Sequence, residues 1–268
     1  MRAKKQTKAS KERKVVIEAP EPPKEKEVAV EEQALMPTGI PGLDDIVGGG
    51  FRRGNVIAVG GGPGTGKTTF ALQFLVNGIR KYGEPGMFIS FEETKHELLG
   101  NMSSYDWNLE ELEKEGKLIF LNYMPHDVDR FINDEFAIEN TIREHGVKRL
   151  AVDSISSLAT IYESEKAERI GFLRMTDRIK TWGCTTILVL NTKTNYYGEI
   201  ISHGRIEFLA DGLIYLYRIR KDEKVMRALE VLKMRGAKIS DAMHRFEFTK
   251  GGIAVVGESP SREVSEVE

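Results

Sequence analysis

One glycine-rich segment constrains the fold of this chain more than any other feature. Residues 61–69 read Gly-Gly-Pro-Gly-Thr-Gly-Lys-Thr-Thr, after an apolar run at 55–60 and before a second one at 70–79. The Gly-x-x-x-x-Gly-Lys-Thr spacing from Gly61 to Thr68 is typical of a phosphate-binding loop, whose backbone N–H groups point at phosphate oxygens from a helix N-terminus. The order strand, loop, helix therefore predicts an α/β fold that binds phosphates at this turn.

The loop supplies side chains as well as backbone groups. We expect Lys67 to reach the β and γ phosphates, which makes it a candidate catalytic residue as well as a binding one. Thr68 is the expected Mg²⁺ ligand, because a hard divalent ion prefers oxygen ligands and bridges the phosphates. The predicted nucleotide-binding positions are Gly61, Gly62, Pro63, Gly64, Thr65, Gly66, Lys67, Thr68 and Thr69.

Composition and charge narrow the class of protein. The net charge of −2 gives no global basic field that would favour nucleic acid or a membrane surface. Apolar stretches such as 185–190 are far shorter than the ~20 residues of a membrane span, and the N-terminus lacks the apolar core of a signal peptide. We therefore expect a cytoplasmic protein without a membrane partner. The single cysteine cannot form an internal disulfide, and the spacing of the five histidines predicts no structural metal site.

Both ends of the chain differ in composition from its middle. Residues 1–34 are mostly Lys, Arg, Glu, Ala and Pro, which cannot bury enough apolar surface to offset the entropy of ordering. We predict a disordered charged tail there, whose basic half at 1–14 leaves open a contact with an acidic partner or nucleic acid. Residues 258–268 are predicted to form a disordered acidic tail, and residues 35–257 one domain.

Apolar runs alternate with helix-period segments through this domain. The alternation predicts a mainly parallel central sheet flanked by helices on both faces, with ligands at the carboxyl ends of the strands. After residue 211 we predict successive antiparallel strands joined by short turns. The predicted strands are 56–59, 87–91, 117–122, 149–152, 185–190, 213–219, 225–233, 245–248 and 253–256, and the predicted helices are 67–81, 95–102, 129–144 and 163–181.

Three carboxylates follow predicted parallel strands and are candidate site residues. Asp153 ends a hydrophobic strand, as the aspartate that orients Mg²⁺ does, although a strand-terminal Asp is also a common helix cap. Glu92 and Glu93 end the strand at 87–91. One of them could hold an attacking water and accept its proton, or both could simply begin the next helix, whose dipole favours acidic residues. The residues alone leave both interpretations open.

Two further features each allow two interpretations. Lys233 and Arg235 project from one face of a predicted strand, where paired cations either clamp a phosphate or protect an edge strand from aggregation. The polar segment 191–203, which contains Tyr196 and Tyr197, is predicted to be a mobile loop. Its aromatic residues either stack on bases or belong to an ordinary surface loop.

Several short motifs occur in order along the chain. They are Thr38-Gly-Ile-Pro-Gly-Leu-Asp44, Gly48-Gly-Gly-Phe51, the phosphate-binding loop, Ile89-Ser-Phe-Glu-Glu93, Val152-Asp-Ser154, Glu207-Phe-Leu-Ala-Asp211 and Leu232-Lys-Met-Arg-Gly236. This ordered set, which extends from about residue 36 to 256, resembles the KaiC family, ATPases of the RecA superfamily. The chain looks like one half of the tandem KaiC protein.

The resemblance implies a RecA-like P-loop NTPase fold and a homohexameric ring with ATP at each subunit boundary. In such a ring Glu92 would activate water with help from Glu93, and Asp153 would organise Mg²⁺. Lys233 and Arg235 would reach the phosphates of the neighbouring subunit.

The chain departs from the KaiC pattern at two places. Glu207 and Phe208 stand where the autophosphorylating half of KaiC carries adjacent Ser and Thr acceptors, so autokinase activity is not expected. Ala237, Lys238 and Ile239 stand where KaiC continues with Thr-Ser-His, which removes contacts that those side chains would make.

The expected function is therefore Mg²⁺-dependent ATP hydrolysis, with a nucleotide state that regulates an unidentified protein partner. One alternative is a recombinase-like ATPase that binds single-stranded DNA through segment 191–203 and the basic tail. Another is a nucleotide-gated scaffold that binds ATP and barely hydrolyses it.

Overall fold

The computed structural model describes residues 34–123, 131, 134–194, 200–201, 206–221 and 224–258. Both predicted tails fall almost wholly outside these residues, so the tails and the domain limits stay predictions. Tyr196 and Tyr197 of the predicted 191–203 loop also lie outside them. Among the described residues, no helix is both long enough and apolar enough to cross a membrane.

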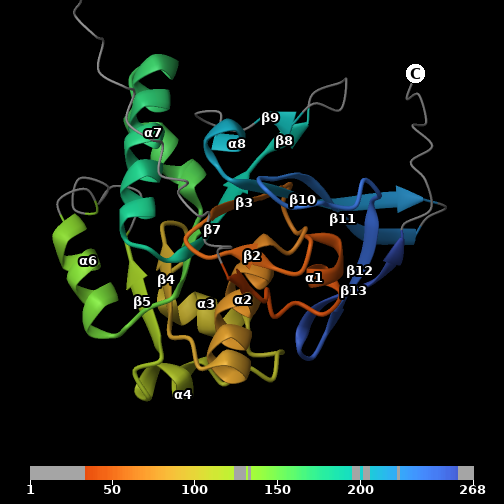
Figure 1. Ribbon diagram of the computed structural model, residues 1–268, viewed down its shortest axis with the longest axis horizontal. Coiled ribbons are helices and arrows are strands. Elements are labelled where there is room, and N and C mark those ends of the chain that lie inside the picture. The colour runs from red at the N-terminus through yellow and green to blue at the C-terminus, as the bar shows by residue number, and fades with distance from the viewer. Residues whose placement is uncertain are drawn as a thin grey trace, which may run out of the picture. The chain divides into compact units, whose positions relative to one another are not determined.

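One mixed sheet organises the domain (Figure 1). Within the described residues its nine strands lie in the order β13-β12-β11-β10-β3-β7-β6-β4-β5. The strands from β10 to β5 in this order run parallel, as predicted from the alternation of strands and helices. Their bounds are β3 Val56–Gly61, β4 Gly86–Ser90, β5 Leu118–Asn122, β6 Arg149–Asp153, β7 Thr185–Asn191 and β10 Gly212–Lys221.

Helices cover both faces of this sheet. In Figure 1, α2 lies on one side of the parallel strands, and α6 and α7 lie on the other. The helix that was predicted over 129–144 is described as α6 from residue 135 onward, and α4 lies in an acidic stretch where no helix was predicted. The bounds are α2 Lys67–Tyr82, α3 Lys95–Asn101, α4 Leu109–Lys114, α6 Glu135–Glu144 and α7 Glu165–Thr181.

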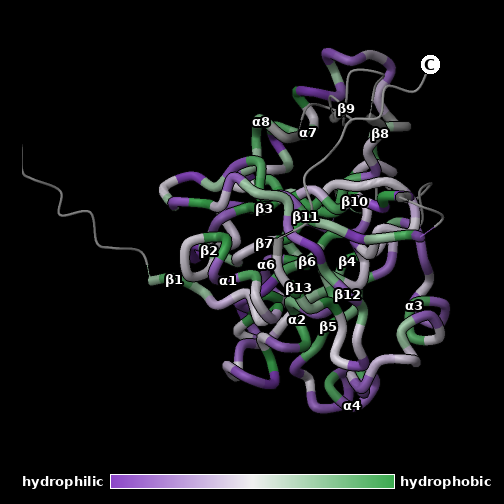
Figure 2. The backbone as a smooth tube through the Cα atoms, turned by 90° about the vertical axis from the view of Figure 1, so that its right-hand side faces the viewer, coloured by the Kyte–Doolittle hydropathy of each residue, from purple (hydrophilic) through white to green (hydrophobic). Residues whose placement is uncertain are grey.

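Alternate residues of the parallel strands pack into two separate cores. On β3, Ile57 and Val59 belong to the core beneath α2, whereas Val56 and Ala58 belong to the core beneath α6 and α7. Successive side chains of a strand point to opposite faces, so a strand buried on both faces is apolar at every position. Hydrophobic segments accordingly gather along the central strands, and hydrophilic ones lie on the outer turns and around α4 (Figure 2).

The C-terminal strands extend the sheet in antiparallel order, as predicted. β10 joins the two parts, because it runs parallel to β3 and antiparallel to β11. Two buried hydrogen bonds tie the last hairpin to α2: Gln73 Nε2 donates to the carbonyl of Ile253 at 2.8 Å, and the Ile253 N–H donates to Gln73 Oε1 at 2.6 Å. These strands are β11 Lys224–Met234, β12 His244–Thr249 and β13 Gly252–Glu258.

Short elements fill the connections. Strand β1 pairs with β2, and β8 pairs with β9 after β7. A 3₁₀ helix, η2, follows β6 directly and was not predicted. The bounds are β1 Leu35–Met36, α1 Leu43–Ile46, β2 Phe51–Arg52, η2 Ile155–Ile161, β8 Lys193–Thr194, β9 Ile200–Ile201 and α8 Ile206–Leu209.

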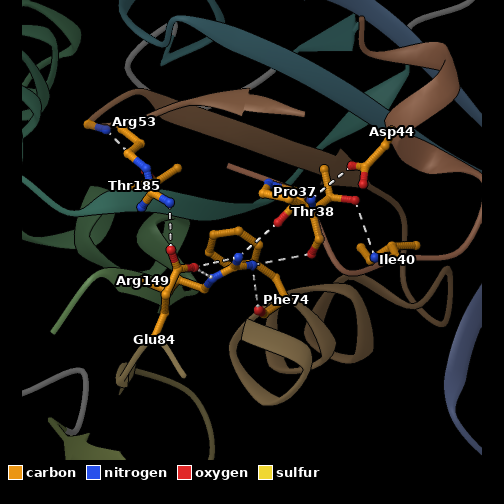
Figure 3. Close-up of polar contacts among 10 residues, drawn as sticks. Pro37, Thr38, Ile40, Asp44, Arg53, Phe74, Glu84, Arg149 and Thr185 are labelled. Carbon is orange, nitrogen blue, oxygen red and sulfur yellow. Dashed lines mark hydrogen bonds and ion pairs between the residues drawn. The ribbon is translucent and has the colours of Figure 1, made fainter. Parts of the chain in front are cut away.

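A buried arginine ties the first described segment to α2 and the sheet (Figure 3). Arg149, at the start of β6, is 0% exposed and donates to Glu84 Oε2 at 2.8 Å, to the Pro37 carbonyl at 2.8 Å and to the Phe74 carbonyl at 3.1 Å. Burial raises the pKa of Glu84, but hydrogen bonds from Arg53 and Arg149 and the charges of both outweigh this effect and leave it lowered. A buried ion pair is tolerated only when its hydrogen bonds are satisfied, and this network satisfies them.

Candidate functional site

The phosphate-binding loop joins β3 to α2 at the carboxyl edge of the parallel strands. Strand β3 ends at Gly61 and α2 begins at Lys67, with Thr69 buried in the first turn. Gly66 has a φ of 103°, which favours glycine, and a Cβ there would lie 2.6 Å from Cζ of Phe248. The loop therefore needs glycine both for its backbone conformation and for its packing.

Lys67 lies within this loop beside two carboxylates. Its Nζ donates to the Gly62 carbonyl at 3.0 Å. Burial lowers the pKa of the Lys67 ammonium, and the charges of Asp153 and Glu92 offset only part of this shift. A partly buried cation at a helix N-terminus is an arrangement that an anion would stabilise.

Thr68 and Asp153 meet at the mouth of the loop. The Thr68 hydroxyl donates to Asp153 Oδ2 at 2.5 Å, which joins the first turn of α2 to the end of β6. Asp153 is 7% exposed, and burial together with the charges of Glu92 and Glu93 raises its pKa to about 6, although Thr68 and Lys67 act in the other direction. A buried carboxylate next to a hydroxyl is a donor set that suits a hard divalent cation.

Three donors converge on one oxygen of Glu92. Glu92 Oε1 accepts from Ser154 Oγ at 2.8 Å, from Ser157 Oγ at 2.9 Å and from Asn191 Nδ2 at 2.7 Å. Ser154 and Ser157 come from the β6–η2 segment, and Asn191 ends β7. The carboxylate is thus oriented by two neighbouring strand ends rather than left free at the surface.

Glu92 and Glu93 precede the next helix and do not lie in its first turn. Helix α3 begins at Lys95, its N-cap is Thr94, and the acidic residue of its first turn is Glu97. Glu97 completes a capping box with Thr94, so the helix N-terminus is already satisfied.

Glu93 turns away from the donors of Glu92. Its Oε1 accepts from Asn101 Nδ2 at 3.3 Å, whereas its Oε2 is buried and has no hydrogen-bond partner within the part of the chain that the structure describes. Its charge still reaches Asp153, whose pKa it raises. A bound cation would relieve this concentration of negative charge.

Lys233 and Arg235 lie near the amino ends of the parallel strands, at the edge opposite the phosphate-binding loop. Arg235 Nη1 contacts Asp211 Oδ1 at 3.2 Å, and Lys233 Nζ donates to the Ala210 carbonyl at 2.6 Å. Asp211 Oδ2 in turn accepts from the backbone N–H of Val56, the first residue of β3. Strand β3 rises ~3.3 Å per residue, so its full length separates this edge from the phosphate-binding loop by roughly 17 Å.

Some residues of this region had no clear signal in the sequence. The serines after Asp153 lacked any partner base for nucleophilic catalysis, and their role as donors to Glu92 became visible only when β4 and β6 were placed side by side. Phe248 lies against Gly66, with the Arg227 guanidinium 4.8 Å from its ring centre. Nothing in the sequence indicated that this hairpin contacts the loop.

Comparison with known proteins identifies the family. A family model described as "ATPase: KaiC" matches residues 36–260. The circadian clock oscillator protein KaiC of Parathermosynechococcus lividus is 36% identical over 225 residues, which cover 81% of this chain and 41% of that protein. Its counterpart in Synechococcus elongatus is 35% identical over 229 residues, which cover 83% and 44%. The chain thus spans less than half the length of these relatives.

A solved structure matches over nearly its whole length. The KaiC-like protein PH0186 from the hyperthermophilic archaeon Pyrococcus horikoshii OT3 aligns with a TM-score of 0.75 and 36% sequence identity. The alignment covers 83% of this chain and 99% of that one. Sequence and structure agree on the RecA-like fold, and the chain belongs to the KaiC family of ATPases.

Proposed function

We propose that this protein is a Mg²⁺-dependent ATPase that works as a ring of identical subunits, and that its nucleotide state regulates a protein partner in the cytoplasm. The observation that carries the proposal is the oriented carboxylate of Glu92 beside the phosphate-binding loop. A phosphate-binding loop alone would serve a binding protein equally well. A glutamate held by three donors at the strand ends is an arrangement for catalysis.

The loop would hold the phosphates of ATP. Backbone N–H groups of residues 61–66 and the N-terminus of α2 supply the anion site, and Lys67 supplies a charge. Thr68 and Asp153 would hold Mg²⁺, which would neutralise phosphate charge there. The hairpin contact of Phe248 with Gly66 offers an apolar surface for the nucleoside end of the ligand.

Glu92 would act as the general base. The water that attacks the γ-phosphate must be held in line, and a carboxylate can accept its proton as the bond to phosphorus forms. The hydrogen bonds from Ser154, Ser157 and Asn191 all reach Oε1, which anchors this oxygen and would leave Oε2 to the water. Glu93 would assist through its charge near Asp153.

Lys233 and Arg235 would act on a neighbouring subunit. They lie at the sheet edge opposite the loop of their own chain, so they cannot reach its phosphates. The Arg235 side chain is 57% exposed while it contacts Asp211, which presents its charge outward. A closed homohexamer would place this edge against the next subunit's nucleotide.

The substitution Glu92→Gln tests the enzyme. It keeps the shape and one acceptor oxygen but removes the base, so the steady-state rate of ATP hydrolysis should fall at least ~100-fold while ATP affinity changes little. Glu110→Gln, at an exposed position of α4, is the matched control and should keep the wild-type rate. Wild-type protein that binds ATP without measurable turnover would instead establish the scaffold.

A further inference from the structure

A partly open cavity lies between η2 and the helices α6 and α7, the two helices on the left of Figure 1. Its volume is about 360 Å³, which is within the range of small-molecule sites. Leu158, Phe131 and Trp182 line its wall and are 2%, 7% and 8% exposed, and Tyr162 and Met175 complete the apolar lining. A partly open cavity of this size with a mainly apolar lining suits a small molecule better than a protein surface, which needs a broad exposed patch.

The cavity wall is continuous with the residues that hold Glu92. Leu158 belongs to η2, and its neighbour Ser157 donates to Glu92 Oε1 at 2.9 Å. On another side, the Phe131 ring lies edge-on to Phe91, with 4.9 Å between ring centres, and Phe91 directly precedes Glu92. Packed interiors transmit small displacements, so a molecule in the cavity would shift the orientation of this carboxylate.

The polar groups around the cavity indicate the chemistry of its ligand. Arg178 is ion-paired with Glu135 and, at 3.6 Å, with Glu139, so its charge is compensated. Arg174 lines the same cavity, is exposed, and has no ion pair among the residues that the structure describes. A single available guanidinium beside apolar walls matches a ligand with an apolar body and one acidic group.

We propose that this cavity is an effector site for a small aromatic or branched aliphatic acid, and that its occupancy changes the rate of ATP hydrolysis through η2 and Phe91. The cavity and Arg174 alone support the proposed binding site. The coupling to hydrolysis rests on the function proposed above for Glu92.

Binding is tested with 8-anilinonaphthalene-1-sulfonate, an aromatic anion that fluoresces in apolar surroundings. The full chain is titrated in saturating ADP and Mg²⁺, so that the nucleotide site is filled. Arg174→Glu should weaken a saturable binding step by about tenfold, because it replaces a charge-assisted hydrogen bond by repulsion. Arg169→Glu, an exposed arginine of α7 outside the cavity lining, makes the same change in net charge and should alter affinity by less than about twofold.

A second variant tests the cavity itself. Met175→Trp adds a bulky side chain to the wall and should remove the saturable step while leaving the thermal unfolding transition cooperative. Equal losses of affinity in Arg174→Glu and Arg169→Glu would overturn the site.

Coupling is measured as the ATPase rate with saturating fluorophore. The rate should change at least about twofold in wild type and in Arg169→Glu, and should stay constant in Met175→Trp. Binding as predicted with an unchanged wild-type rate would overturn the coupling. If Glu92→Gln retained full activity, the proposed function would fail while the binding titration still decided the site.

Discussion

The two edges of the parallel strands handle charge in opposite ways. At the carboxyl edge, Asp153, Glu92 and Glu93 crowd together, and the pKa of Asp153 is raised to about 6. At the other edge, Asp211 is surrounded by donors: Lys180 at 2.9 Å, Arg235 at 3.2 Å and the N–H of Val56. At the first edge the three carboxylates outnumber the nearby cation Lys67. At the second edge the cations Lys180, Lys233 and Arg235 outnumber Asp211.

In the proposed ring, this difference would divide one active site between neighbouring subunits. The carboxyl edge carries Glu92, the proposed base, and Thr68 and Asp153, the proposed ligands of Mg²⁺. The opposite edge carries the exposed guanidinium of Arg235, which Asp211 holds in place. In the proposed ring this guanidinium is suited to the phosphates of a neighbouring subunit. The following tests would break or sharpen this comparison, starting with the largest expected effect.

Mixing two inactive variants tests whether the edges work together across subunits. Glu92→Gln and Arg235→Ala should each lose at least ~100-fold in turnover, because one lacks the base and the other the neighbouring cation. The two variants are mixed in equal amounts, disassembled and reassembled. About a quarter of the sites should then recover turnover, because at those sites an intact Glu92 meets an intact Arg235 from the neighbouring subunit. The hydrolysis rate is measured before and after mixing, and no recovery would place both residues in one chain's site.

The substitution Asp153→Asn tests the uncompensated charge at the carboxyl edge. A carboxyl whose pKa is higher in the folded than in the unfolded protein binds its proton more tightly when folded, so stability is lost as pH rises from about 4 to about 6. At pH 7.5 the ligand-free variant should therefore exceed wild type in unfolding free energy by ~1–3 kcal/mol. Denaturant titration at pH 7.5 and pH 5 measures the difference, which should shrink at the lower pH.

Nucleotide should reverse that order. Asparagine keeps the acceptor for Thr68 but lacks the charge that Mg²⁺ needs, so Mg²⁺ and ADP should stabilise wild type far more than Asp153→Asn. A variant less stable than wild type without ligand at pH 7.5 would contradict the account of Asp153.

The substitution Asp211→Asn tests the anchor at the opposite edge. Asparagine still accepts from the Val56 N–H but lacks the charge that pairs with Lys180 and Arg235, so turnover should fall about tenfold and the free energy of unfolding should fall as well. In an Arg235→Ala background the same substitution should have almost no further effect on turnover, because the group that it positions is absent. Additive losses in the double variant would mean that Asp211 acts independently of Arg235.

Much of the fold was predictable because local patterns and long-range packing agree. The predicted strands and long helices match the observed elements to within a few residues where they are described, and β10 to β13 follow as an antiparallel extension. Helix α4 and η2 were missed because short helices carry too few residues for a periodic signal. Lys233 lies at the edge opposite the phosphate-binding loop because β10 pairs with β3, which lies more than 150 residues earlier in the chain.

The sequence by itself determined the phosphate-binding loop, because its glycine spacing and the flanking strand and helix are local properties of consecutive residues. It also determined the alternation that leads to a parallel sheet. Only the tertiary structure decided that Glu92 is held by Ser154, Ser157 and Asn191 rather than beginning a helix. The physical reason is that these side chains become neighbours only when separate strands end side by side, and strand pairing is set by the packing of the whole domain.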